Sequence, residues 1–72
     1  MYFKRLADLR IDHDIGQKEL AAYLNMTRQV YGCYERGERE LPVWALIKLA
    51  DYYQTSTDYI LGRTDNPSLP RA

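Results

Sequence analysis

Residues 17–37, with the sequence QKELAAYLNMTRQVYGCYERG, constrain the fold more than any other part of the chain. Apolar residues recur at helical spacing on both sides of Asn25, which indicates two short helices whose apolar faces meet. Asn tolerates a positive φ better than most residues, and Thr27 is a favourable N-cap for a following helix. The segment therefore predicts helices over 17–24 and 28–36 joined by a tight turn. The residues expected at their contact are Leu20, Ala21, Leu24, Met26, Tyr31 and Tyr34.

Three further helices are predicted from the same periodicity outside this segment. The first covers residues 2–12. Gly37 suits the C-terminal cap of the preceding helix, and Pro42 is well placed at the start of a fourth helix that runs to about residue 53. Ser56 is the expected N-cap of a short fifth helix at 57–61. The inner face of the fourth helix is predicted to be Val43, Leu46, Ile47, Leu49, Ala50 and Tyr53.

A chain of 72 residues has room for one small domain, whose core is close to the minimum for independent folding. No strand is predicted, so the expected fold class is all-α. The domain is placed at residues 1–63. Residues 64–72 contain two prolines and little apolar content, so they are expected to form a flexible C-terminal tail or a partner-binding arm.

The charge balance argues mildly against a nucleic-acid binder, because ten Lys plus Arg balance ten Asp plus Glu. Residues 17–39 nevertheless carry four basic and three acidic side chains. If Glu35 is paired internally, this segment becomes net basic. A single cysteine, no long apolar run and no signal peptide favour a soluble cytoplasmic protein without a membrane partner.

Enzymatic chemistry is not expected from this chain. No nucleophile, base and orienting group occur together, and one histidine with one cysteine, His13 and Cys33, cannot build a metal site. Nothing marks the Cys33 thiol as acidified, which argues against a redox switch. We therefore expect no metal, no cofactor and no small-molecule ligand.

From Leu6 to Gly62 the chain resembles the Cro/C1-type helix-turn-helix family, also called XRE, of phage repressors and small bacterial regulators. The resemblance implies a compact five-helix, lambda-repressor-like DNA-binding domain. It also implies that the third helix enters the major groove and that homodimers bind near-palindromic operators in double-stranded DNA. The residues that carry it are Gln17, Leu20, Ala21, Tyr34, Glu35, Arg36, Gly37, Leu46, Lys48, Leu49, Ala50 and residues 58–62.

The same resemblance places Arg28, Gln29, Gly32 and Cys33 on the outward face of the third helix. Arg28 can grip a guanine edge with two hydrogen bonds, and Gln29 can do the same with adenine. The alternative for Arg28 is a phosphate contact alone. Gly32 and Cys33 offer only close approach or an apolar contact with a thymine methyl group, so few direct base contacts are expected.

Five residues are candidates for phosphate contacts. Gln17 begins the second helix, where the helix N-terminus adds a partial positive charge, although it can equally be an ordinary solvated residue. Arg39 lies in the loop that faces the DNA backbone in this family. Lys18, Thr27 and Arg36 complete the set.

Two further groups of residues are expected to have structural roles, one in an ion pair inside the domain and one in a dimer interface. The resemblance pairs Arg10 with Glu35, and a partly buried pair of this kind fixes orientation more than it stabilises. A dimer interface is expected around Tyr52, Tyr59 and Ile60, where nearby aspartates would repel DNA. Three locations are open for the indole of Trp44: the edge of the core, the DNA backbone or a surface that binds a partner.

Two functions are consistent with these residues. The first is a sequence-specific transcriptional regulator, with a repressor or Cro-like switch expected. The second is a protein-binding module of the same fold, antitoxin-like or controlled by a regulatory protein partner, with weak DNA binding. The neutral charge and the Gly32-Cys33 pair favour the second a little, whereas Arg28 and Gln29 favour the first.

Overall fold

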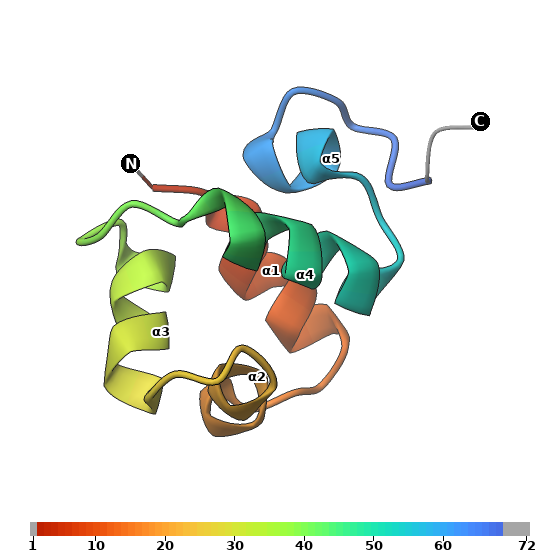
Figure 1. Ribbon diagram of the computed structural model, residues 1–72. Coiled ribbons are helices and arrows are strands. Elements are labelled where there is room, and N and C mark those ends of the chain that lie inside the picture. Colours follow the sequence, from red (N-terminus) through yellow and green to blue (C-terminus); the bar gives the residue numbers. More distant parts are fainter. Residues whose placement is uncertain (1, 69–72) are drawn as a thin grey trace.

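Five helices surround a single core in the computed structural model, which describes residues 2–68 (Figure 1). They are α1 (Lys4–Asp12), α2 (Gln17–Tyr23), α3 (Arg28–Arg36), α4 (Val43–Tyr53) and α5 (Thr57–Leu61). Residues 2–68 contain no strand, and the predicted all-α fold class is confirmed. None of the described helices is long and apolar enough to cross a membrane.

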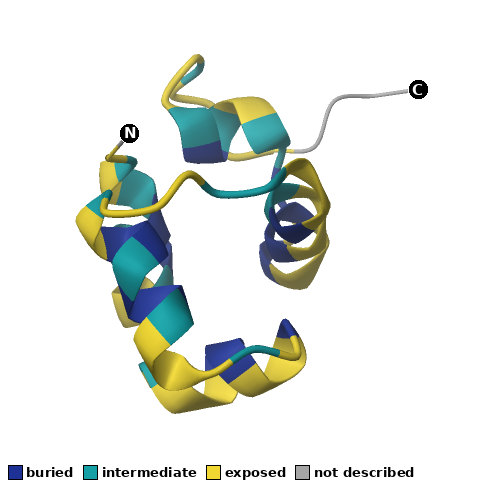
Figure 2. Cartoon of the chain, turned by 60° about the vertical axis from the view of Figure 1, so that its left-hand side comes forward, coloured by how far each residue is buried: buried dark blue, intermediate teal, exposed yellow. Residues whose placement is uncertain are grey.

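Every helix contributes at least one buried side chain to the core, and the buried side of each helix faces the centre of the molecule (Figure 2). Full burial of a leucine or isoleucine side chain contributes about 1.5–3 kcal/mol relative to exposure. Ala21, in α2, is buried in the core, and α2 packs against α3. The core residues are Leu6, Leu9, Leu20, Ala21, Leu24, Tyr31, Tyr34, Ala45, Leu49, Ala50, Tyr53 and Ile60.

Local turn chemistry sets the path between α2 and α4 as predicted. Asn25 has a φ of 58°, and the Oγ1 of Thr27 accepts a hydrogen bond of 3.2 Å from the amide of Val30. These two features reverse the chain and satisfy a free amide at the start of α3. Gly37 ends α3 with a φ of 75°, a left-handed conformation that glycine adopts without a Cβ penalty.

Three predicted helix boundaries are wrong by one or two residues. The first helix begins at Lys4 rather than residue 2, because Phe3 is an extended N-cap residue that packs against the core. Leu24 is the C-cap of α2 rather than its last residue. Pro42, with a ψ of 152°, is the N-cap of α4 and not its first helical residue. Cap residues are only half inside a helix, so apolar periodicity does not locate them.

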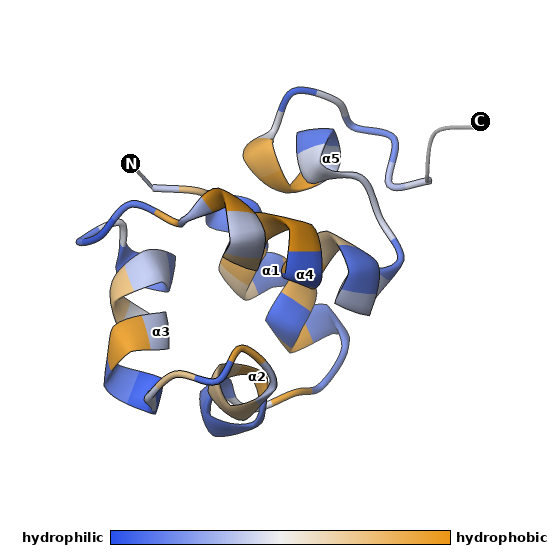
Figure 3. Ribbon diagram, in the orientation of Figure 1, coloured by the Kyte–Doolittle hydropathy of each residue, from blue (hydrophilic) through white to orange (hydrophobic). Residues whose placement is uncertain are grey.

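The predicted inner face of α4 is partly wrong. Val43 and Ile47 are 70% and 49% exposed, whereas Ala45, which was not predicted, is fully buried. Figure 3 shows apolar residues along much of α4, so apolarity alone does not distinguish its inward from its outward side. The buried strip instead runs through Ala45, Leu49 and Tyr53 at intervals of four residues.

The start of the C-terminal segment is hydrogen-bonded to the domain. The guanidinium of Arg5 donates to the backbone carbonyl of Thr64 and to the carboxylate of Asp65. The hydroxyl of Thr55 donates to the carbonyl of Pro67 at 2.6 Å. Residues 64–67 therefore lie against the helices. The boundary predicted after residue 63 stays a prediction, and residues 69–72 of the expected flexible tail lie outside the described residues.

Candidate nucleic-acid interface

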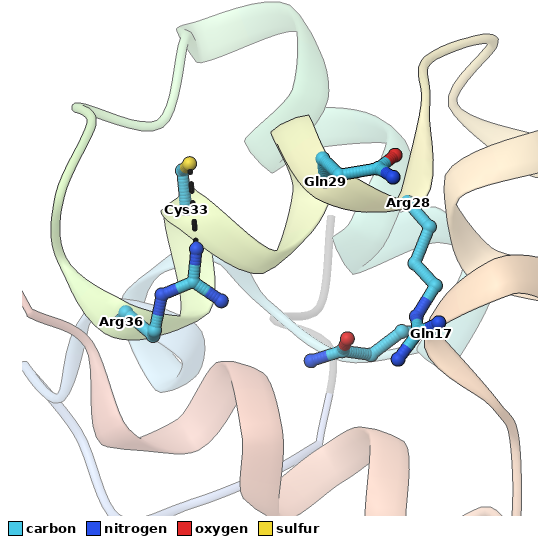
Figure 4. A pocket seen from close by; sticks show the side chains of 5 residues that line it. All are labelled: Gln17, Arg28, Gln29, Cys33 and Arg36. Atoms are coloured by element: carbon cyan, nitrogen blue, oxygen red, sulfur yellow. Dashed lines mark hydrogen bonds between the residues drawn. The ribbon is translucent and has the colours of Figure 1, made fainter.

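An open hollow of about 310 Å³ lies between the start of α2 and the outward face of α3 (Figure 4). Its lining contains two guanidinium groups, two carboxamides and a thiol, and no carboxylate. Such a surface is rich in hydrogen-bond donors and suits acceptor atoms such as phosphate oxygens or the N7 and O6 of guanine. The lining residues are Gln17, Arg28, Gln29, Cys33 and Arg36, all of which the sequence had predicted as DNA contacts.

The first turn of α3 presents two of these side chains to solvent. Arg28 and Gln29 directly follow the cap residue Thr27, and both are exposed. In Figure 4 the side chain of Arg28 extends toward Gln17 across the end of the hollow. The positive partial charge of the α3 N-terminus adds to the charge of the arginine. This end of the hollow therefore presents two exposed side chains that can donate hydrogen bonds.

Gly32 is not an open position on the outward face, and that prediction needs correction. The residue is buried, because the side chain of Arg36 lies over it. A Cβ atom placed on Gly32 would come within 2.9 Å of Arg36 Nη1. Cys33 is partly exposed, with its Sγ 3.6 Å from Arg36 Nη2. The middle of α3 therefore presents the side chain of Arg36 rather than the surface of Gly32.

Arg36 is held by a carboxylate that sequence reasoning missed. Its Nε and Nη2 donate to the two oxygens of Glu38 at 2.8 and 3.2 Å. Hydrogen bonding to Glu38 raises the pKa of Arg36, and the same contact lowers the pKa of Glu38. Residues two apart do not face each other in a helix, but the left-handed Gly37 turns the chain back beside its end. The sequence signal that could have revealed this ion pair is the presence of opposite charges on either side of a C-cap glycine.

A buried polar network lies behind the hollow and joins three helices. Arg10 of α1 donates from Nε and Nη2 to the two oxygens of Glu35 in α3, at 2.7 and 3.3 Å. Gln17 at the start of α2 donates to Glu35 Oε1 at 3.1 Å. A further bond of 3.0 Å connects Arg10 Nη1 to the carbonyl of Ile15 in the loop. One amide hydrogen of Gln17 is thus committed to Glu35.

Protonation of the network follows from burial and hydrogen bonding. Burial of Glu35 favours its neutral form, but hydrogen bonds from Arg10 and Gln17 outweigh it, so the pKa of Glu35 lies below its usual range. Burial, reinforced by the Glu35 carboxylate, raises the pKa of Tyr31 and Tyr53. Neither tyrosine hydroxyl has a hydrogen-bond partner among the described residues. The network therefore holds one anion, one cation and two neutral phenols at physiological pH.

The remaining phosphate candidates lie outside the lining of the hollow. Lys18 and Arg39 are exposed, in the first turn of α2 and in the loop after α3. Thr27 is also exposed, and its oxygen already accepts the capping hydrogen bond. Across residues 2–68 no group of three or more His, Cys, Asp or Glu side chains is arranged to hold a metal ion.

The residues predicted for a dimer interface do not form one exposed surface. Ile60 is 1% exposed and belongs to the core, so its assignment to an interface is wrong. Tyr59 is half-buried, with the guanidinium of Arg5 4.1 Å from its ring centroid. Tyr52 is exposed and packs against Tyr23 with ring centroids 4.8 Å apart. Neighbouring residues of the short α5 point in different directions, so Ile60 faces the core.

Comparison with known proteins connects this arrangement to transcriptional regulators. A helix-turn-helix family model matches residues 6–60 of the chain. The chain is 40% identical over 67 residues to the uncharacterized HTH-type transcriptional regulator YobD of Bacillus subtilis, covering 93% of this chain and 60% of YobD. It is 39% identical to the HTH-type transcriptional regulator ImmR of the same organism, covering 86% of this chain and 49% of ImmR.

Two further similarities agree with these. The cryptic phage CTXphi transcriptional repressor RstR of Vibrio cholerae is 30% identical, with 74% of this chain and 48% of RstR covered. The crystal structure of a transcriptional regulator from Listeria innocua superposes with a TM-score of 0.81 at 26% identity, covering 92% of this chain and 62% of that structure. The chain thus spans about half to three-fifths of the length of these proteins.

Proposed function

We propose that this chain, which belongs to the Cro/C1-type helix-turn-helix family of transcriptional regulators, is a sequence-specific repressor. The family is a DNA-binding and non-enzymatic class. In this proposal α3 lies in the major groove. The observation that carries the proposal is the donor-rich hollow between α2 and α3, with Arg28 and Gln29 exposed at its end. In the major groove each base pair presents a distinct set of donors and acceptors. Exposed arginine and glutamine side chains match that code.

Within this proposal the base contacts are few. Arg28 grips the O6 and N7 of a guanine, and Gln29 pairs with the N6 and N7 of an adenine. Cys33, which is partly exposed one turn further along α3, contacts a thymine methyl group. Three side chains per recognition helix carry limited sequence information, so a single domain binds a short half-site.

Phosphate contacts position the helix over that half-site. Lys18 in the first turn of α2 and Arg39 in the loop after α3 supply exposed positive charge, and the Thr27 hydroxyl can donate while its oxygen caps α3. Gln17 has one amide hydrogen bonded to Glu35, which orients the other hydrogen for a phosphate oxygen. These contacts carry no sequence information themselves and raise affinity for all duplexes.

The protein acts as a homodimer in this proposal. Two recognition helices double the contacts and allow a near-palindromic operator with half-sites about one helical turn, 10 to 10.5 base pairs, apart. A repressor role is supported by the similarity of the chain to RstR, a transcriptional repressor. Sedimentation of the protein alone and with its operator measures the stoichiometry, and a single monomer on a full-affinity site contradicts the dimer.

Selection of duplexes from a random library, followed by fluorescence anisotropy, tests the DNA-binding role. Arg28→Ala should weaken binding to the selected site by about 1–3 kcal/mol and relax the preference at one base pair per half-site. Arg39→Ala, the matched control, should weaken selected and random duplexes alike. Equal losses on both duplexes for Arg28→Ala would contradict base reading, and no binding at low salt would contradict the DNA-binding proposal altogether.

A further inference from the structure

The middle of α3 is covered by a side chain that belongs to the next turn of the helix. Arg36 lies across Gly32, and all three heavy atoms nearest to a Cβ at Gly32 are guanidinium atoms of Arg36. Arg36 lines the hollow that contains Arg28 and Gln29, and Gly32 lies beneath its guanidinium. In Figure 4 Arg28 and Arg36 lie at opposite ends of this hollow, with Cys33 beside Arg36.

The backbone does not require glycine at position 32. Gly37 and Gly62 are the glycines with positive φ among the described residues, and Gly32 is in the interior of a regular helix. A glycine there is less favourable than alanine by about 1 kcal/mol. The only atoms that an alanine methyl group would meet closely are the flexible end of Arg36. The glycine therefore provides space for the guanidinium and serves no need of the helix itself.

The guanidinium is held by an ion pair that is exposed to solvent and open to exchange. Glu38 takes hydrogen bonds from Nε and Nη2, whereas Nη1 takes part in neither contact. Both side chains of this ion pair are 56% exposed. A carboxylate that grips a guanidinium with two oxygens presents the same pattern of acceptors as the O6 and N7 edge of guanine. Glu38 thus occupies the donors that a guanine would use.

We propose that Gly32 and Arg36 act together as a specificity-determining pair, in which the missing side chain at position 32 lets Arg36 reach across α3 and bind a guanine edge in place of Glu38. This inference rests on the proposed binding of duplex DNA through α3. It assigns Arg36 to base reading rather than to the phosphate contact expected from the sequence. Arg28 and Arg36 would then read two separate guanines at the two ends of the hollow.

The test compares Arg36→Ala, Gly32→Ala and the double variant with the wild-type protein. Affinities are measured by anisotropy on the library-selected operator, on a set of operators with one base pair changed at a time, and on random duplex. Arg36→Ala should weaken operator binding about 5- to 150-fold and abolish the preference at one base pair per half-site that Arg28→Ala leaves intact. Random-duplex binding should change by a much smaller factor.

The Gly32→Ala variant distinguishes an effect on the position of Arg36 from an effect on the stability of α3. Its methyl group should displace the guanidinium, lose the preference at the same base pair and leave the melting temperature unchanged or raised, because alanine is the better helix former. The double variant should bind no more weakly than Arg36→Ala. Gly16→Ala is the matched control and should leave the base preferences unchanged, because it adds the same methyl group outside α3 at a position where no other atom lies within 4 Å.

Several results would overturn the inference while leaving the proposed function intact. An equal loss on operator and random duplex for Arg36→Ala would identify a phosphate contact. Unchanged base preferences in Gly32→Ala would show that the glycine does not set the position of the guanidinium. A wild-type protein that binds no duplex at low salt would instead reject the proposed function, and the inference with it.

Discussion

Two arginine-glutamate pairs at the end of α3 have almost the same geometry and very different surroundings. Arg10 and Glu35 approach to 2.7 Å, and Arg36 and Glu38 to 2.8 Å. The side chain of Glu35 is 6% exposed, whereas that of Glu38 is 56% exposed. The first pair joins residues 25 apart and the second joins residues two apart. Distance alone therefore does not distinguish a structural ion pair from an exchangeable one.

The difference lies in what replaces each partner when the pair opens. Water reaches Arg36 and Glu38 freely, and another anion can take the place of Glu38. Glu35 is enclosed by α1, α2 and its own helix, so loss of Arg10 would leave a charge without water. The first pair, together with Gln17, consequently joins three helices, whereas the second keeps a guanidinium at the surface.

The largest effect that tests this contrast is expected from Glu35→Ala. The substitution leaves Arg10 buried without its anion and should lower the free energy of unfolding by about 3–5 kcal/mol. A domain with so small a core would then be mostly unfolded at moderate temperature. Thermal unfolding followed by circular dichroism measures the change, with Glu38→Ala as control. Equal melting temperatures for the two variants would contradict the distinction between a structural and an exchangeable ion pair.

A smaller effect is expected from acid. Because the pKa of Glu35 is lower in the folded than in the unfolded state, its contribution is complete above the unfolded-state pKa of about 4.3. The contribution decreases as the pH falls below that value and is lost once the pH has passed through the folded-state pKa. Urea unfolding between pH 7 and pH 2 should therefore show a weaker acid dependence for Glu35→Gln than for wild type. Parallel curves would contradict the assignment.

Removal of the third member of the buried network should have a moderate effect. Gln17→Ala deletes one hydrogen bond to the Glu35 carboxylate but leaves Arg10 in place, so about 1 kcal/mol of stability should be lost. Chemical denaturation at pH 7 measures it. Lys18→Ala, one residue further along α2 and exposed, is the matched control and should be close to neutral.

The smallest effect is expected for the exposed pair. Glu38→Gln removes the carboxylate charge but leaves Arg36 in water, so the melting temperature should stay unchanged within error. High salt should make no difference to that comparison. A marked loss of stability would show that the pair supports the end of α3, and the contrast with Arg10 and Glu35 would then fail.

Local rules predicted much of the site. Asn25 at positive φ, Thr27 as N-cap and Gly37 as C-cap all follow from conformational preferences that act within a few residues. With these turns in place, α3 begins at Arg28 and exposes Arg28 and Gln29. Periodicity then brought the predicted candidates of α2 and α3 to the same hollow.

Contacts between side chains far apart in the sequence were harder to predict. The pairing of Arg10 with Glu35 was implied by a family resemblance, and the bond from Gln17 to Glu35 was not predicted. Arg5 has several acidic residues within reach in the sequence, and only the fold brings it to Asp65 and over the ring of Tyr59. A long, flexible side chain takes its partner from three-dimensional proximity, which the spacing of residues along the chain does not encode.

The amino-acid sequence by itself determined the number of helices, the turn between α2 and α3 and the exposed start of α3, because caps, turns and periodicity are short-range properties. Tertiary structure decided which side of α4 is buried, that Ile60 lies in the core, and that Arg36 covers Gly32. The physical reason is that α4 has apolar residues on more than one side and Arg36 has more than one position open to it. Only packing against the other elements selects among such locally equivalent arrangements.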